Sequence, residues 1–250
     1  MSIMWTNKVS PFIHGETIEE WDIKMANISL LVWKKLIKPD KAAKLAKLDK
    51  HDREVYVGKL MQKDPKIRDG LEQAFTEIVE LFLKANKLDR ETDVVSIKKD
   101  AIFVRNRTIK HPEFDNVKFR VKGNYKGFLC IPGYEFYYVP GKYPDVKGIS
   151  DSALHKHKDG VLEFINSVFE EAHDQKELEL FMKEYSEAYK EKKLPFDAYR
   201  EFTSQSTFRV VMFGNEIDMD DIDEDLLDNL DISYNYTKIY LEVLKLVIGK

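Results

Sequence analysis

The chain has 250 residues, of which 43% are hydrophobic, and its formal net charge is −4. Such a length and composition predict a globular protein with a sizeable core and exclude a wholly disordered chain. The negative charge argues against a strongly basic nucleic-acid coat. Cys130 is the only cysteine, so an intramolecular disulfide and a cysteine-rich zinc site are excluded.

The two ends of the chain indicate a soluble protein. The first eight residues lack a charged segment followed by an apolar core, so no signal peptide is predicted. The apolar run 232–248 carries Lys238, Glu242 and Lys245, which favours a buried helix over a membrane span. A chain without disulfides fits a reducing compartment. We therefore expect a cytoplasmic location and no membrane contact.

The first half of the chain alternates extended and helical patterns. The first section, to about Val32, is expected to be extended with turns, with residues 26–33 as a possible helix start. Pro39 starts a second helix, because proline is favoured in the first helical turn. Apolar residues recur at helical spacing from Leu71 to Phe82. Residues 93–105 are rich in β-forming residues and indicate either two strands joined by a tight turn or one long strand.

The second half begins with strands and continues with helices. Apolar and charged residues alternate from 116 to 149, and glycines punctuate this stretch. Amphipathic faces then predict helices over 161–169 and 178–189, and a last helix over 234–248. The pattern predicts the α+β class, with a mixed core followed by a helical C-terminal part.

Two aspartates interrupt stretches that are otherwise typical of buried segments. Asp22 lies within residues 20–31, and Asp100 lies within residues 94–104. A buried carboxylate needs a partner, because an unpaired buried charge is very costly. Magnesium is a natural partner, since it binds one or two carboxylates together with substrate phosphates. The alternative is that each aspartate caps a turn or pairs with a nearby lysine.

The order of these features resembles the palm and thumb of family B DNA polymerases over roughly residues 15–190. Asp22 matches the first metal ligand of that family, and Asp100-Ala101-Ile102-Phe103 matches the second half of its hairpin motif. The fingers signature and the lysine-glycine element before the thumb are matched by Arg53 with Tyr56-Val57-Gly58-Lys59, and by Lys147-Gly148-Ile149. Lys98-Lys99 replace the first half of the hairpin motif, and Asn27 stands where the family has its sugar-gating tyrosine.

The resemblance implies a fold and a reaction. Residues 1–150 would form an antiparallel palm-like sheet with packed helices, including a short helical insertion at about 38–90, and residues 151–250 a helical thumb-like region. Asp22 and Asp100 would be the catalytic metal ligands for Mg²⁺, because nucleotidyl transfer uses carboxylates that hold two ions about 3.5–4 Å apart. Positive charge for the triphosphate would come from Arg53, Lys59 and Lys63.

A basic and aromatic stretch at 118–126 indicates a nucleic-acid contact. Cationic side chains could hold the phosphate backbone while an aromatic ring stacks on a base. The candidate nucleic-acid-binding residues are Lys118, Arg120, Lys122, Tyr125, Lys126 and Lys147. An ordinary exposed strand, with apolar residues inward and charged residues outward, explains the same alternation.

Two further clusters have simple explanations. His155, His157 and His173 suggest a metal site, but Lys156 and Lys158 surround the first two, which favours a solvated helix start. The acidic segment 216–231 lacks the glycine and glutamate that a calcium loop requires. It is a solvated surface or a docking site for a basic protein partner.

Three hypotheses follow. The first is a polymerase-like nucleotidyltransferase that uses magnesium on a nucleic-acid template, with a related case in which the fold is kept and the activity is lost. The second is a module that binds nucleic acid or a protein without chemistry. The third is a phage-encoded accessory subunit whose acidic segment and apolar last helix dock onto a larger assembly.

Overall fold

The computed structural model describes residues 4–147, 158–191, 193, 201–204, 207–212 and 215–217. The chain divides into two compact units. Unit 1 comprises Met1–Ser10 and Glu16–Tyr125, and unit 2 comprises Pro11–Gly15 and Lys126–Lys250. Two long strands, β2 (Phe12–Ile23) and β6 (Val117–Ile131), contribute residues to both units.

Unit 1 contains an antiparallel sheet with the strand order β1-β3-β4-β2-β6. The short strands are β1 (Met4–Thr6), β3 (Val94–Lys98), β4 (Ala101–Arg105) and β5 (Glu113–Phe114), and β5 pairs with β6. Lys98 pairs with Ala101, which leaves Lys99 and Asp100 as a two-residue turn. Lys99 has a φ of 58°, the sign that the first turn residue of a tight hairpin requires. Of the two sequence-based alternatives, the pair of strands is therefore confirmed.

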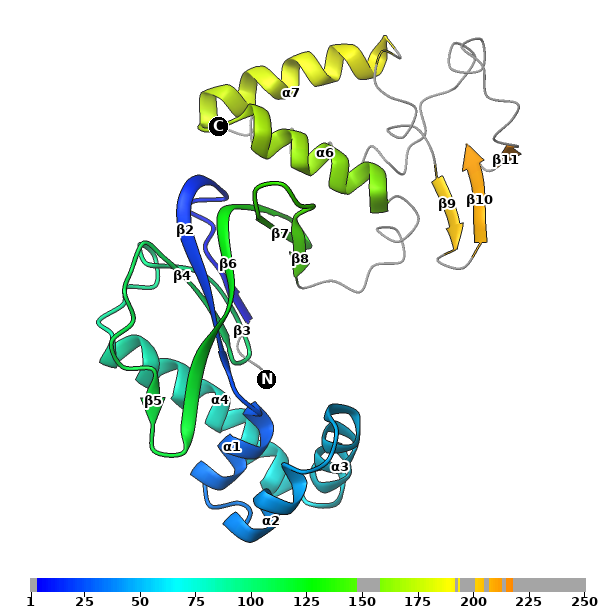
Figure 1. Cartoon of the computed structure of the whole chain (residues 1–250). Helices are drawn as coiled ribbons and strands as arrows, with labels where there is room; N and C mark the ends of the chain where they lie inside the picture. Colours follow the sequence, from blue (N-terminus) through cyan, green and yellow to red (C-terminus); the bar gives the residue numbers. More distant parts are fainter. Residues whose placement is uncertain are drawn as a thin grey trace. The chain divides into compact units, whose positions relative to one another are not determined.

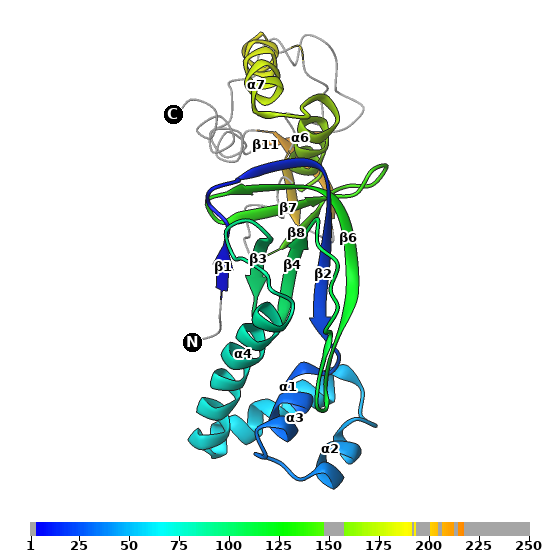
Figure 2. The ribbon, with the colours of Figure 1, turned by 90° about the vertical axis from the view of Figure 1, so that its left-hand side faces the viewer.

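Four helices occupy the stretch between β2 and β3. They are α1 (Ala26–Trp33), α2 (Pro39–Leu45), α3 (Lys50–Lys63) and α4 (Pro65–Ala85). Asp49 begins α3 by accepting a hydrogen bond from the N–H of Asp52, and Asp64 begins α4 by accepting one from the N–H of Lys66. In Figures 1 and 2, α4 runs beside the strands, and α1, α2 and α3 lie beyond the end of β2.

The core of unit 1 forms between α4 and one face of the sheet. Phe82 of α4 is fully buried and contacts Phe119 at 4.4 Å and Trp21 at 6.2 Å between ring centroids. Successive side chains of a strand point to opposite faces. Since Trp21 faces the helices, Glu20 and Asp22 face the other side of the sheet. This alternation places Glu20 and Asp22 on the sheet face opposite to α4.

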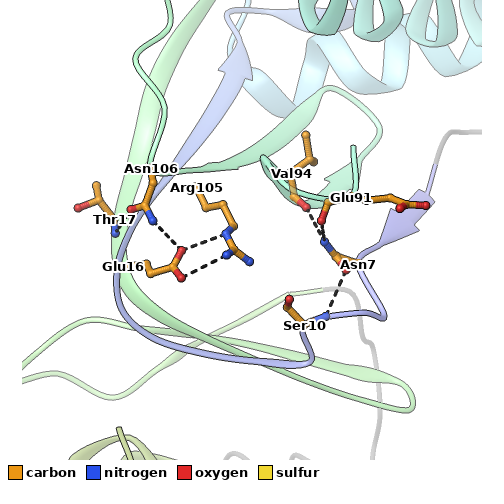
Figure 3. A network of polar contacts seen from close by, with 8 residues as sticks. All are labelled: Asn7, Ser10, Glu16, Thr17, Glu91, Val94, Arg105 and Asn106. Carbon is orange, nitrogen blue, oxygen red and sulfur yellow. Dashed lines mark hydrogen bonds and ion pairs between the residues drawn. The ribbon is translucent and has the colours of Figure 1, made fainter. Parts of the chain in front are cut away.

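A buried asparagine joins the start of the chain to β3 (Figure 3). The side-chain amide of Asn7 donates to the carbonyl oxygens of Glu91 at 2.6 Å and Val94 at 3.2 Å. Its oxygen accepts hydrogen bonds from the backbone N–H groups of Val9 and Ser10. One side chain thus satisfies four backbone groups, which explains why a polar residue is 1% exposed.

Replacing Asn7 by alanine is expected to lower the free energy of unfolding by about 1–2 kcal/mol, because buried backbone groups lose their partners. Chemical denaturation measures this change. Ser10→Ala is the matched control, since Ser10 takes part through its backbone N–H, which alanine keeps. Equal stability of the two variants would contradict the role assigned to Asn7.

Unit 2 combines the end of β6 with β7 (Tyr134–Tyr138), β8 (Asp145–Lys147), α6 (Lys158–Glu171) and α7 (Gln175–Lys190). The strands are antiparallel in the order β6-β7-β8. Phe169 of α6 stacks on Tyr138 at 4.8 Å between ring centroids. A Cβ at Gly127 would lie 2.8 Å from the Phe169 ring, so glycine is required for this close approach.

The α+β class and the antiparallel sheet with packed helices are confirmed. Helices α6 and α7 agree with the expected helical stretches. The structure adds a three-stranded antiparallel sheet formed by β9 (Glu201–Ser204), β10 (Thr207–Met212) and β11 (Asn215–Ile217), where a helical part was expected. The division into palm-like residues 1–150, with its insertion at about 38–90, and thumb-like residues 151–250 stays a prediction.

Two expected features of the C-terminal part lie largely or wholly outside the described residues. They are the last helix at 234–248 and the acidic segment, of which only residues 216 and 217 are described, in β11. Across the part of the chain that the structure describes, no helix has the length and apolar character needed to cross a membrane.

Candidate functional site

The carboxylates of Asp22 and Asp100 meet in unit 1. Asp22 is the penultimate residue of β2, and Asp100 is the second residue of the β3–β4 turn. Trp21 pairs with Ile102 across β2 and β4, and continuing this register places Asp22 beside the turn. Asp22 therefore lies close enough to Asp100 to influence the pKa of that carboxyl group. Strand pairing thus brings together two acids that are far apart in sequence.

The environment of Asp100 favours its protonated form. Burial, the hydrogen bond with Asp22 and the charge of Asp22 together raise the pKa of Asp100 to about 7, from an ordinary value of 3.8. Two adjacent carboxylates raise a pKa in this way because both cannot easily carry a charge. Near neutral pH, Asp100 is therefore protonated in about half of the molecules.

Lys122 of β6 brings positive charge to the same group of acids. Its Nζ lies 3.1 Å from Oε1 of Glu20 and 3.4 Å from Oδ2 of Asp22. Burial by itself would lower the pKa of Lys122, but the bonds and charges of Glu20 and Asp22 outweigh burial and raise the pKa. Lys122 therefore forms ion pairs with both Glu20 and Asp22. The sequence had suggested a nucleic-acid contact for this lysine.

Glu20 is the functional candidate that the sequence reasoning missed. Its side chain is only 3% exposed, and Oε2 accepts a 2.8 Å hydrogen bond from the hydroxyl of Tyr125. Glu20 and Asp22 are two residues apart on one strand, so they share a face. That spacing is the sequence signal that could have identified Glu20.

Tyr125 supports Glu20 from a buried position. It is 4% exposed, and its ring lies 6.2 Å from that of Phe103 between centroids. The sequence suggested that this ring stacks on a base, but in the structure the ring is buried and not exposed for stacking. A Cβ at Gly123 would lie 2.5 Å from the Tyr125 hydroxyl oxygen, so the absence of a side chain at 123 makes room for this tyrosine.

Gly123→Ala is expected to displace the Tyr125 ring and to lower the free energy of unfolding by about 1–2 kcal/mol, as overpacking typically does. Thermal or chemical unfolding measures the loss. Asn124→Ala changes an exposed neighbour on the same strand and is expected to leave stability nearly unchanged. A Gly123→Ala variant as stable as wild type would show that Tyr125 does not depend on this space.

The acids offer two ligands to a metal ion. Within the described residues, no group of three or more histidine, cysteine, aspartate or glutamate side chains could hold a metal ion. The metal ligands that the sequence resemblance implies are Asp22 and Asp100. Magnesium is bound in proteins by one or two carboxylates together with substrate phosphates and water. Two carboxylates are donors of the type that this ion uses, and Lys122 already places positive charge against Asp22.

The predicted triphosphate-binding residues lie on α3. Lys59 and Lys63 are exposed, and Arg53 donates to the carbonyl oxygen of Leu48 at 2.6 Å. Helix α3 belongs to unit 1, as do both aspartates. Among the described ion pairs, none joins these three residues to Asp22 or Asp100. The structure therefore places the cations in the same unit without bringing them into contact with the acids.

The predicted nucleic-acid-binding residues divide into two sets. Lys118 and Arg120 are exposed at alternate positions of β6 in unit 1, and Lys118 forms an ion pair with Glu113 at 3.0 Å. Lys126 and Lys147 belong to unit 2, where Lys147 lies 3.8 Å from Asp145. Of the predicted nucleic-acid-binding residues, Lys118 and Arg120 are therefore exposed in the same unit as the acids, and no described ion pair joins them to Asp22 or Asp100.

His173 has a neighbour that the sequence did not suggest. Its ring lies 4.7 Å from the ring of His14, within unit 2, and its backbone N–H donates to Glu177. Burial and the nearby His173 lower the pKa of His14. His155 and His157 lie outside the described residues.

Comparison with known families decides the relationship of the chain. The model of the bacteriophage PBS1 gene 130 protein family matches residues 3–249. The chain belongs to this family. No curated protein matches it. Membership of the PBS1 gene 130 family establishes a phage protein, as the third sequence-based hypothesis had it, and gives no support to a relationship with family B polymerases.

Proposed function

We propose that this phage protein is a magnesium-dependent nucleotidyltransferase that acts, like a polymerase, on a nucleic-acid template. The observation that carries the proposal is the register of β2 and β4, which brings Asp22 beside the turn that holds Asp100. Two carboxylates that approach each other on a sheet face opposite to the packed helices form the minimum donor set for this chemistry. Both also lie in unit 1 with the exposed cations of α3.

Each residue has a defined part in this proposal. Asp22 and Asp100 would hold magnesium, and Asp100 would give up its proton to do so. Bound magnesium supplies the positive charge that stabilises the attacking and leaving oxygens. Arg53, Lys59 and Lys63 would neutralise a triphosphate that approaches from α3.

Primer extension tests the proposal. Purified protein is incubated with nucleoside triphosphates and a primed template, using DNA and RNA templates in separate reactions, with Mg²⁺ or with EDTA. Incorporation that depends on Mg²⁺ on at least one template is the expected result. A folded protein that extends no primer on either template would overturn the proposed reaction.

A non-catalytic nucleic-acid-binding module is the second candidate function. The ion pair between Lys122 and Asp22 favours it, because a lysine then neutralises the acid without a metal. Lys118 and Arg120 would carry the phosphate contacts on the exposed side of β6. In that case binding to single strands would weaken steeply with salt, as counterion release requires.

Substitutions separate this candidate from the enzyme. Arg120→Ala would weaken single-strand binding, measured by fluorescence anisotropy at several salt concentrations, whereas Asp22→Asn would leave it unchanged. The non-catalytic candidate fails if Arg120→Ala binds as tightly as wild type. It also fails if binding requires Mg²⁺ and Asp22.

A further inference from the structure

Lys122 lies between a fixed carboxylate and a candidate metal ligand. Glu20 is almost completely buried, and Tyr125 holds its second oxygen at 2.8 Å. Asp22 is more open, with 16% of its side chain exposed. The ammonium group therefore contacts one acid that is held in place and one that is accessible to an ion.

The Lys122 side chain has the length and the exposure that a shift of its ammonium group requires. Half of its side chain is exposed, and lysine carries its charge on a flexible four-carbon stem. A shift of the ammonium group away from Asp22 would leave its contact with Glu20, at 3.1 Å, available. Lys122 would thus keep one of its two present carboxylate contacts, the one with Glu20, which Tyr125 holds in place.

The present position of the Lys122 ammonium group, 3.4 Å from Oδ2 of Asp22, is unfavourable for a divalent ion bound to the same carboxylate. Like charges a few ångströms apart repel strongly in a partly buried site. A metal ion that binds Asp22 is therefore repelled by Lys122 as long as the ammonium group stays on that carboxylate. The free energy of the ion pair that is lost when Lys122 leaves lowers the metal affinity.

We propose that Lys122 is a tethered cation that competes with the divalent metal ion for Asp22 and so sets the metal concentration at which the site fills. The proposal rests on the proposed function, because it concerns the same two carboxylates. It assigns Lys122 to the regulation of the metal site rather than to phosphate binding, and it assigns Glu20 with Tyr125 to holding the lysine when the metal is bound.

Direct measurement of Mn²⁺ affinity tests this inference without any catalytic activity. Free Mn²⁺ is followed by electron paramagnetic resonance during titration of wild type, Lys122→Met and Lys122→Arg. The methionine side chain has similar length and no charge, so Lys122→Met is expected to bind about tenfold more tightly than wild type, whereas Lys122→Arg should resemble wild type.

Lys118→Met is the matched control, because it removes the same charge from another exposed lysine of β6 that pairs with a carboxylate. It is expected to change Mn²⁺ affinity less than twofold. The double variant Asp22→Asn/Lys122→Met should lose the tight site, which places the gain at Asp22.

The inference is overturned if Lys122→Met binds Mn²⁺ no more tightly than wild type, including the case in which neither binds. A tenfold gain without primer extension by wild type or variant would support the inference and refute the proposed reaction. Primer extension together with unchanged Mn²⁺ affinity would refute the inference and leave the proposed reaction intact.

Discussion

Asp22→Asn is expected to reduce Mg²⁺-dependent primer extension by roughly 10²–10³-fold, the loss typical when one stabilising group is removed from a developing charge. Asparagine keeps the shape of the side chain but loses the negative charge that holds the metal ion. The strand that carries Asp22 should remain paired, because its backbone hydrogen bonds are unchanged. Rates of single-nucleotide incorporation at saturating Mg²⁺ measure the effect.

The matched control is Asp115→Asn, which makes the same chemical change at an exposed aspartate in the turn between β5 and β6. Its rate is expected to stay within twofold of wild type. Incorporation by Asp22→Asn at the wild-type rate would remove Asp22 from the reaction. Circular dichroism of each variant checks that loss of rate is not loss of fold.

Asp100→Asn is expected to stabilise the metal-free protein at pH 8 by about 2–3 kcal/mol and to leave it nearly unchanged at pH 4. The pKa of Asp100 is raised to about 7 in the folded protein, from an ordinary 3.8. Between these two values the folded state keeps a proton that the unfolded state has lost, so wild-type stability falls as pH rises from about 4 to 7. Asparagine cannot ionise and can still donate a hydrogen bond to Asp22.

The magnitude is smaller than the full shift would give at about 1.4 kcal/mol per pKa unit, because Asp100 is partly exposed and solvent screens its charge. Denaturant unfolding in EDTA at several pH values provides the measurement. Asp115→Asn again serves as the control, with a difference from wild type that does not grow with pH. A pH-independent difference for Asp100→Asn would mean that its carboxyl is not held in the protonated form.

The sequence was informative where local patterns decide the structure. Helical spacing from Leu71 to Phe82 identified α4, because an amphipathic helix must bury its apolar face against the sheet. Runs of β-forming residues around Lys99 and Asp100 identified strands β3 and β4, although two strands and one long strand remained alternatives. The aspartates themselves were identified from their position within apolar segments.

The sequence was less informative about partners across the sheet. Which residue of β6 lies beside Glu20 depends on strand register, and no local pattern specifies it. The alternation of Lys118, Arg120 and Lys122 suggested three equivalent exposed cations, whereas register brings only Lys122 onto Glu20 and Asp22. The hydroxyl of Tyr125 donates a hydrogen bond to Glu20 from a buried position, where Gly123 leaves room for the tyrosine ring.

Short strands in the C-terminal part were also missed. Strands β9, β10 and β11 have between three and six residues each. Segments of that length carry too few alternations to distinguish a strand from a connecting loop. The expectation of a helical region from 151 onward was based on the stronger patterns of α6 and α7.

The central claim is that Asp22 and Asp100 together bind a divalent metal ion. Anomalous diffraction from crystals soaked in Mn²⁺ tests it most directly, because the ion is located independently of any activity. The claim predicts an anomalous peak within about 2.5 Å of a carboxylate oxygen of both Asp22 and Asp100. Crystals that show no peak there, with the two carboxylates still hydrogen-bonded to each other at saturating Mn²⁺, would contradict it.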